Sequence, residues 1–192
     1  MNADVISSEW GETVPVEKIK EKLKEKKYAA MTVTHVDTST GVCAPVAEIG
    51  KMMKEFPETI YIVDGVCATA GEPEDVDAMG IDILFTGSQK AFGVAPGLTM
   101  LWASGKALER RKSLGSIPEF YIDFEKWLPV MKDTAKYFAT PAINMIWALK
   151  ESVRIIKAVS YTHLRAHETV LDIVCRLLLE KKKKKKSPTQ SR

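Results

Sequence analysis

The chain has 192 residues, of which 45% are hydrophobic and 28% are charged, a composition typical of a soluble globular domain with a sizeable core. It contains no apolar run long enough to span a bilayer, and its first residues lack the layout of a signal peptide. Three cysteines without metal-ligand spacing or a disulfide framework argue against a zinc-binding or disulfide-rich secreted protein and favour the cytoplasm.

The first third of the sequence predicts a helix, a strand and a second helix. Residues 15–28 form a helical pattern because apolar residues recur at helical spacing after a proline suited to a first turn: Pro15, Val16, Ile19 and Leu23. The β-branched run 29–35 predicts a strand. Residues 44–56 predict an amphipathic helix. Its expected buried face consists of Val46, Ile49, Met53 and Phe56.

The middle of the sequence contains two further apolar runs, 59–64 and 81–85, which predict two buried strands. Between them, residues 72–80 predict a short helix that begins near Pro73 and ends at Gly80.

The last elements are less regular. Residues 97–104 are a candidate fourth strand, residues 105–114 predict a helix, and the aromatic-rich stretch 120–133 is expected to be partly helical. Residues 141–157 predict a long helix that Pro141 starts. Its expected apolar face consists of Ile143, Ile146, Leu149 and Val153.

Strands with apolar residues on both faces, alternating with helices, predict an α/β fold with a mostly parallel sheet flanked by helices. Right-handed crossovers would place the carboxyl ends of the strands along one edge, where open α/β sheets bind ligands. His35, Asp64 and the loop that carries Lys90 all follow such strand ends. A single lysine is usually a solvated surface residue, so this gathering of polar residues is what favours a site.

Asp64 and Lys90 suggest a particular chemistry. A carboxylate at the end of an apolar strand needs a partner, although an aspartate before a glycine is also a common turn residue. A lysine amine in a loop of small residues can form a Schiff base with a carbonyl. The two residues lie about one strand–helix–strand unit apart, which suits a pyridoxal ring held between an aspartate and a lysine.

Four segments resemble a known family. They are "THVDTSTGV", "IVDGVCATAGEP", "GIDILFTGSQKAFGVAPG" and "YFATPAINMIWALKES". In this order and spacing they are similar to the class V aminotransferases, which depend on pyridoxal 5′-phosphate (PLP) and have fold type I, and in particular to the alanine–glyoxylate and serine–pyruvate branch. The resemblance covers nearly all of residues 8–157. It implies that residues 1–157 form part of a PLP-binding large domain.

The resemblance also implies roles for individual residues. Lys90 corresponds to the Schiff-base lysine, and Gln89 corresponds to a glutamine that contacts the cofactor. Asp64 corresponds to the aspartate on the pyridine nitrogen, and Val66 to the residue that packs against the ring. Thr38 takes the position of a hydroxyl residue that hydrogen-bonds the cofactor.

Two more residues, Tyr137 and Thr140, match positions that reach the cofactor phosphate of the neighbouring subunit in the family's homodimer. His35 also matches a family position, but no catalytic role is assigned to it. The reaction implied is transfer of an amino group from alanine or serine to glyoxylate or pyruvate. The implied partners are therefore small amino acids and 2-oxo acids, and neither nucleic acid nor a membrane.

The two ends of the chain depart from the family pattern. An N-terminal part and a C-terminal small domain have no counterpart, so the chain is expected to be an incomplete fragment. Residues 158–192 are expected to be a non-native tail without globular structure, because residues 159–186 resemble a translated sequencing adapter. Without residues 159–192 the chain holds 19 basic and 22 acidic residues, a net charge of −3 in place of +3.

Two alternatives stay open. One is a PLP-dependent lyase or cysteine desulfurase-like enzyme of the same fold, which needs a mobile catalytic cysteine. Cys43 and Cys67 lie beside the motifs but are more typical of small core residues. The other alternative is a catalytically inactive fragment.

Overall fold

The computed structural model describes residues 2–158. The predicted non-native tail, residues 158–192, lies outside the described residues except for Ala158, the last described residue of a helix. The elements in chain order are α1 (Val16–Glu25), β1 (Ala30–Thr34), α2 (Val46–Met53), β2 (Ile60–Asp64), β3 (Ile83–Gly87), β4 (Thr99–Ala103), α3 (Gly105–Ser113), α4 (Phe124–Lys132), the 3-10 helix η1 (Thr134–Lys136) and a helix at 143–158.

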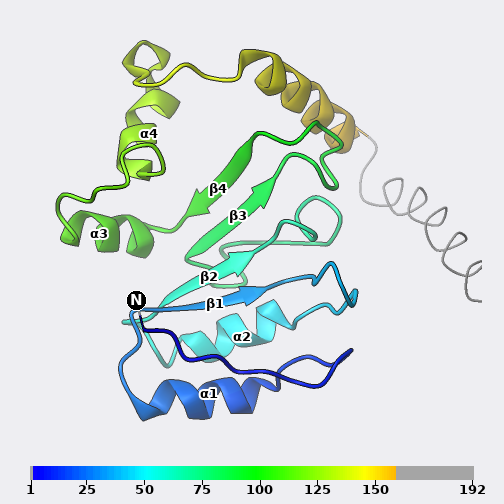
Figure 1. Ribbon diagram of the computed structural model, residues 1–192, viewed down its shortest axis with the longest axis vertical. Coiled ribbons are helices and arrows are strands. Elements are labelled where there is room, and N and C mark those ends of the chain that lie inside the picture. The colour runs from blue at the N-terminus through cyan, green and yellow to red at the C-terminus, as the bar shows by residue number, and fades with distance from the viewer. Residues whose placement is uncertain (1, 159–192) are drawn as a thin grey trace, which may run out of the picture.

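The four strands form one sheet in the order β1-β2-β3-β4 (Figure 1). β1 pairs with β2, and β2 with β3, in parallel, whereas β4 runs antiparallel to β3. The predicted α/β class with a mostly parallel sheet is therefore confirmed. The antiparallel direction of β4 follows from its connection, since residues 88–98 form a loop without the crossover helix that a parallel strand needs.

The core lies on the face of the sheet that α1 and α2 cover. Ile19 and Leu23 of α1 and the apolar face of α2 pack there against the buried strand residues Tyr61, Val63 and Leu84. Three of the four residues predicted for the α2 face are buried, and the fourth, Phe56, is half-buried. Because strand side chains alternate between faces, Asp64 projects from the opposite face of the sheet to Val63.

The prediction of a helix at residues 72–80 is wrong. Residues 76–80 form turns, in which a single helical bond joins Met79 N–H to the Asp75 carbonyl at 2.8 Å. Gly80 adopts a left-handed backbone with φ +64°, and Ile81 N–H donates back to the Val76 carbonyl at 2.9 Å. The left-handed Gly80 and this backward hydrogen bond end the single helical turn, so no helix forms.

The long helix predicted at 141–157 is present at 143–158, and of its predicted apolar face Leu149 and Val153 are half-buried. Ile143 and Ile146 are 52% and 44% exposed, whereas Met145 and Ser152 contact the loop 88–98. The helix therefore packs on a loop rather than on the sheet. No helix within residues 2–158 is both long and apolar enough to cross a membrane.

Candidate functional site

The carboxyl ends of β1, β2 and β3 gather at one edge of the sheet (Figure 1). Thr34, the final residue of β1, pairs with Asp64, the final residue of β2, and Asp64 pairs with Phe85 inside β3. Thr38, Asp64 and Lys90 lie at or just beyond these ends. The edge therefore carries Asp64 at the end of β2, and Thr38 and Lys90 in the loops that follow β1 and β3.

Asp64 is held by contacts on both sides. Its carbonyl accepts the backbone N–H of His35 at 2.9 Å, and its carboxylate oxygen Oδ1 accepts the N–H of Val66 at 2.9 Å. The next residue, Gly65, donates its N–H to the Phe85 carbonyl at 2.9 Å. The half-buried carboxylate is therefore fixed in direction by its own turn.

The loop after β1 touches the loop after β2. Thr38 Oγ1 lies 2.8 Å from Cys67 Sγ, next to Val66. Within the first loop, the Asp37 carboxylate accepts hydrogen bonds from the hydroxyl and the N–H of Thr40 at 2.7 and 2.8 Å. These bonds stabilise the charged form and lower the pKa of Asp37. The Thr38 hydroxyl thus stands beside the residues that follow Asp64.

A buried pair fastens the segment after β2 to the end of β1. His35 Nδ1 and Glu74 Oε1 are 2.6 Å apart, and both side chains are almost fully buried. Among the described residues, the other carboxylate oxygen of Glu74 and the hydroxyl of Thr69 are buried without a hydrogen-bond partner. No local sequence pattern indicates this pair, because its members are 39 residues apart.

Lys90 and Gln89 are exposed in the turn that follows β3. Within residues 2–158, neither a hydrogen bond nor an ion pair involves the Lys90 amine. The edge therefore combines an uncommitted primary amine with the fixed carboxylate of Asp64 on the neighbouring strand. This donor set fits PLP, which needs an amine for its aldehyde and an anion for its ring nitrogen.

Tyr137 and Thr140 lie apart from these residues. Both are exposed, in the segment between η1 and the helix at 143–158. That segment lies beyond β4, on the far side from β1 (Figure 1). The structure thus brings together Thr38, Asp64 and the Lys90 loop, and it does not bring Tyr137 and Thr140 to them.

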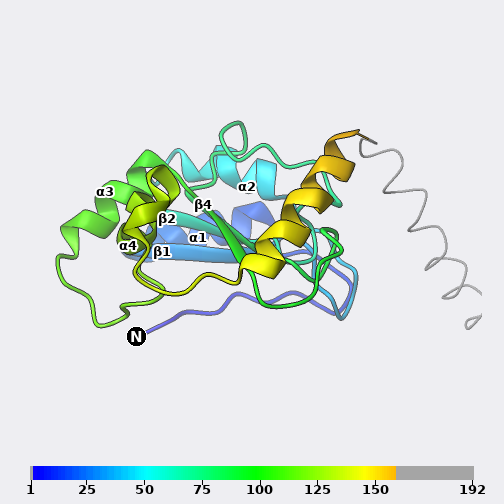
Figure 2. The ribbon, with the colours of Figure 1, turned by 90° about the horizontal axis from the view of Figure 1, so that it is seen from above.

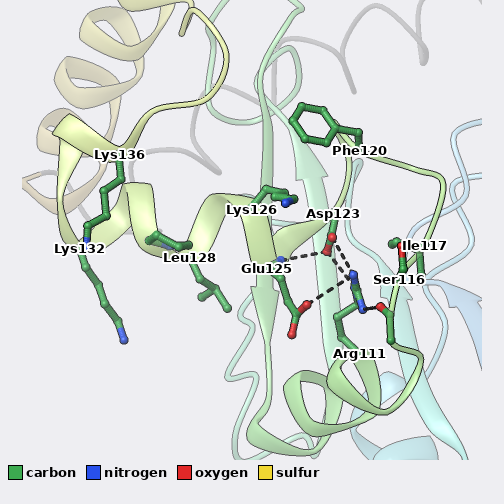
Figure 3. Close-up of a pocket in the computed structure, with 12 residues that line it drawn as sticks. Arg111, Ser116, Ile117, Phe120, Asp123, Glu125, Lys126, Leu128, Lys132 and Lys136 are labelled. Atoms are coloured by element: carbon green, nitrogen blue, oxygen red, sulfur yellow. Dashed lines mark hydrogen bonds and ion pairs between the residues drawn. The ribbon is translucent and has the colours of Figure 1, made fainter.

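Figure 2 shows α3 and α4 at the end of the sheet opposite the carboxyl ends of β1 and β2. A hollow of about 780 Å³ is lined by residues of these two helices and of the segment between them. None of the predicted site residues lines it. Its arginine, Arg111, donates two hydrogen bonds to the Asp123 carboxylate at 2.8 and 2.6 Å and a third to the Gly115 carbonyl at 2.8 Å (Figure 3). This guanidinium is already satisfied, so the hollow offers no free arginine for an anionic substrate.

Two residues that were not singled out from the sequence hold the Lys90 loop, one from within it and one from outside. Ser88 is fully buried within it, and Ser152 donates a hydrogen bond to the Phe92 carbonyl. Ser88 could have been noticed because it lies in the segment "TGSQK" beside Lys90. The sequence around Ser152 contains no comparable indication.

Comparison with known proteins places these features in a family. The family model for class V aminotransferases matches residues 2–189. Alanine–glyoxylate aminotransferase 1 from Saccharomyces cerevisiae is 37% identical over 153 residues, which are 75% of this chain and 40% of that protein. Serine–glyoxylate aminotransferase from Arabidopsis thaliana is 28% identical over 183 residues, 93% of this chain and 45% of that protein.

A solved structure agrees with the sequence matches. The alanine–glyoxylate aminotransferase from Nostoc sp. superposes with a TM-score of 0.81 at 28% identity, covering 91% of this chain and 47% of that one. The chain thus spans less than half the length of the relatives it matches.

Proposed function

The chain belongs to the class V aminotransferase family, and from that premise we propose that it supplies the lysine and aspartate of a PLP-dependent aminotransferase. The amino group would pass from alanine or serine to glyoxylate or pyruvate; alanine, serine and glyoxylate appear in the names of the yeast and Arabidopsis relatives. The observation that carries the proposal is the position of Asp64 and Lys90 at the ends of neighbouring parallel strands.

Each residue has a defined task in this proposal. Bound PLP supplies an aldehyde that condenses with amines and a protonated ring that accepts electrons. Lys90 would attach the cofactor through its amine, and the same amine would take and return the substrate's α-proton. Asp64 holds the proton on the ring nitrogen. Val66 packs against the ring, while Thr38 and Gln89 hydrogen-bond the cofactor.

The remaining assignments concern the whole protein. We propose that Tyr137 and Thr140 serve the cofactor phosphate of a second subunit, which is consistent with their exposure. A homodimer in the cytoplasm is part of the same proposal.

The lyase or desulfurase alternative receives less support from the described residues. It needs a reactive thiolate, and thiolates form at cysteines with lowered pKa. Desolvation, together with the carboxylates of Glu72 and Glu74, raises the pKa of Cys43. Cys67 is engaged with Thr38. Neither environment favours a mobile nucleophile.

Lys90 can be tested directly in the 192-residue chain. PLP is added, the link between its aldehyde and an amine is reduced with borohydride to a stable secondary amine, and the labelled peptide is identified by mass spectrometry. We expect Lys90 to be the preferred site, and Lys90→Arg to remove that label, because a guanidinium stays protonated and does not condense. Preferred labelling of another lysine would contradict the proposal.

A further inference from the structure

Ser88 is the most constrained residue of the loop that carries Lys90. It has no exposed surface, although Gln89 and Lys90 beside it are exposed. Its hydroxyl donates to the Ala95 carbonyl at 2.7 Å and accepts the N–H of Leu98 at 3.3 Å. One side chain therefore ties the start of the loop to its end.

The backbone of Ser88 closes the same loop. Its N–H donates to the Leu98 carbonyl at 3.1 Å, and its carbonyl accepts the N–H of Val94 at 3.0 Å. Between these bonds, Gly93 donates its N–H to the Lys90 carbonyl at 2.9 Å with a left-handed backbone of φ +65°. Lys90 thus starts a tight turn whose ends are held by Ser88.

The helix at 143–158 braces the loop from outside (Figure 1). Ser152 donates its hydroxyl to the Phe92 carbonyl. A Cβ atom at Gly97 would lie 2.9 Å from Met145 Sδ, so helix and loop are in close contact there. Exposed lysine loops are usually mobile, and this one is fixed from within and from outside.

We infer that Ser88 is a positioning residue for Lys90: its buried hydroxyl holds the loop so that the Lys90 amine is presented at the strand edge. This inference rests on the proposed function, because it assigns Ser88 to the reaction that Lys90 performs. The physical reason is that ordering a lysine-bearing segment costs free energy, and a loop ordered in advance avoids that cost when the cofactor binds.

The brace itself can be measured without cofactor. Ser88→Ala removes the acceptor of the Leu98 N–H, so exchange of that backbone amide with deuterium should be about tenfold faster, the value expected for one lost hydrogen bond. Ser113→Ala is the matched control. It also deletes a hydroxyl that donates to a backbone carbonyl at 2.7 Å, in this case that of Arg110 at the end of α3, and should leave Leu98 exchange unchanged.

The positioning role is measured by where PLP attaches. At limiting PLP followed by borohydride, the ratio of label on Lys90 to label on all other lysines should fall roughly fivefold or more in Ser88→Ala, the change expected when one backbone position loses its order. Ser152→Ala should lower the ratio in the same direction, and Ser113→Ala should not. Ser152→Ala also carries the test if circular dichroism shows that Ser88→Ala does not fold.

Two outcomes separate the inference from the proposed function. If the unsubstituted chain does not prefer Lys90, the proposed function is overturned and the inference with it. If the unsubstituted chain prefers Lys90 and both serine variants keep the same ratio, the proposed function stands and the positioning role is overturned.

Discussion

Asp123 is a buried carboxylate whose charge is stabilised mainly by Arg111. Its two oxygens accept hydrogen bonds from Arg111 (Figure 3), and these bonds are the main cause of its lowered pKa. Because the folded chain holds this proton less tightly than the unfolded chain, acid favours unfolding. The stability that Asp123 contributes is present above the ordinary aspartate pKa of about 4 and is lost as the pH falls through its folded value.

We therefore expect the stability advantage of the unsubstituted chain over Asp123→Asn to shrink as the pH falls from neutral to below about 4. Urea denaturation of both proteins at several pH values measures the difference. The amide keeps the shape of the side chain, so packing changes little between the two. An advantage that does not change with pH would mean that the Asp123 charge does not stabilise the fold.

At the residue scale, sequence reasoning found chemically active side chains but not their structural partners. Asp64 and Lys90 could be placed because Asp64 ends one apolar strand and Lys90 lies in the loop that follows the next. The pairs His35–Glu74 and Arg111–Asp123 could not, because both require knowledge of how loops pack on one another. A buried pair of hydrogen-bonded polar side chains has no periodic pattern, and its members are recognised only once both are buried.

Among the helices, α2 lies very close to the turn at residues 76–80 through Gly50. A Cβ atom added to Gly50 would lie only 1.7 Å from the Met79 carbonyl oxygen. That atom belongs to the backbone and cannot move away by a side-chain rotation. We expect Gly50→Ala to lower the free energy of unfolding by about 1–3 kcal/mol or more, measured by urea denaturation.

Gly105 provides the matched control for Gly50, since the same substitution in the first turn of α3 meets no atom within 4 Å. Gly105→Ala should be neutral or should stabilise by up to about 1 kcal/mol, because alanine restricts the unfolded chain. Equal effects at the two glycines would show that the close approach of Gly50 to the Met79 carbonyl is not the cause of the change in the free energy of unfolding.

Most helices and strands could be predicted because their apolar periodicity is local. The failures came from tertiary contacts. The turn at 76–80 stops where Gly80 closes it, and a helical pattern of nine residues does not reveal that closure. The helix at 143–158 shows the opposite case: its periodicity was correct, but Met145 and Ser152 select the face that packs, leaving Ile143 and Ile146 exposed.

At the scale of the whole molecule, large apolar side chains are exposed along the last third of the described chain. Ile122, Met131 and Trp147 are 74%, 73% and 64% exposed. Surfaces of this kind bind apolar dyes and promote association. We expect the chain to enhance the fluorescence of an apolar dye and to sediment faster as its concentration rises.

Ile146→Lys should reduce both the dye signal and the association, because it places a charge on this surface. Asn144→Lys adds the same charge at an exposed polar position of the same helix and should change both signals less. Equal effects of the two variants would attribute the association to net charge rather than to the apolar surface.

The strand order has a consequence for synthesis. After β1, each strand pairs with the strand that precedes it in the chain. The sheet can therefore grow one strand at a time as the ribosome releases the polypeptide. The loop with Thr38 and the strand end with Asp64 can form before Lys90 emerges. The Lys90 loop then closes on Leu98 soon afterwards, but its outer brace waits for Ser152. A translational pause between these two points would hold a nascent chain in which the lysine is in place but not yet fastened from outside.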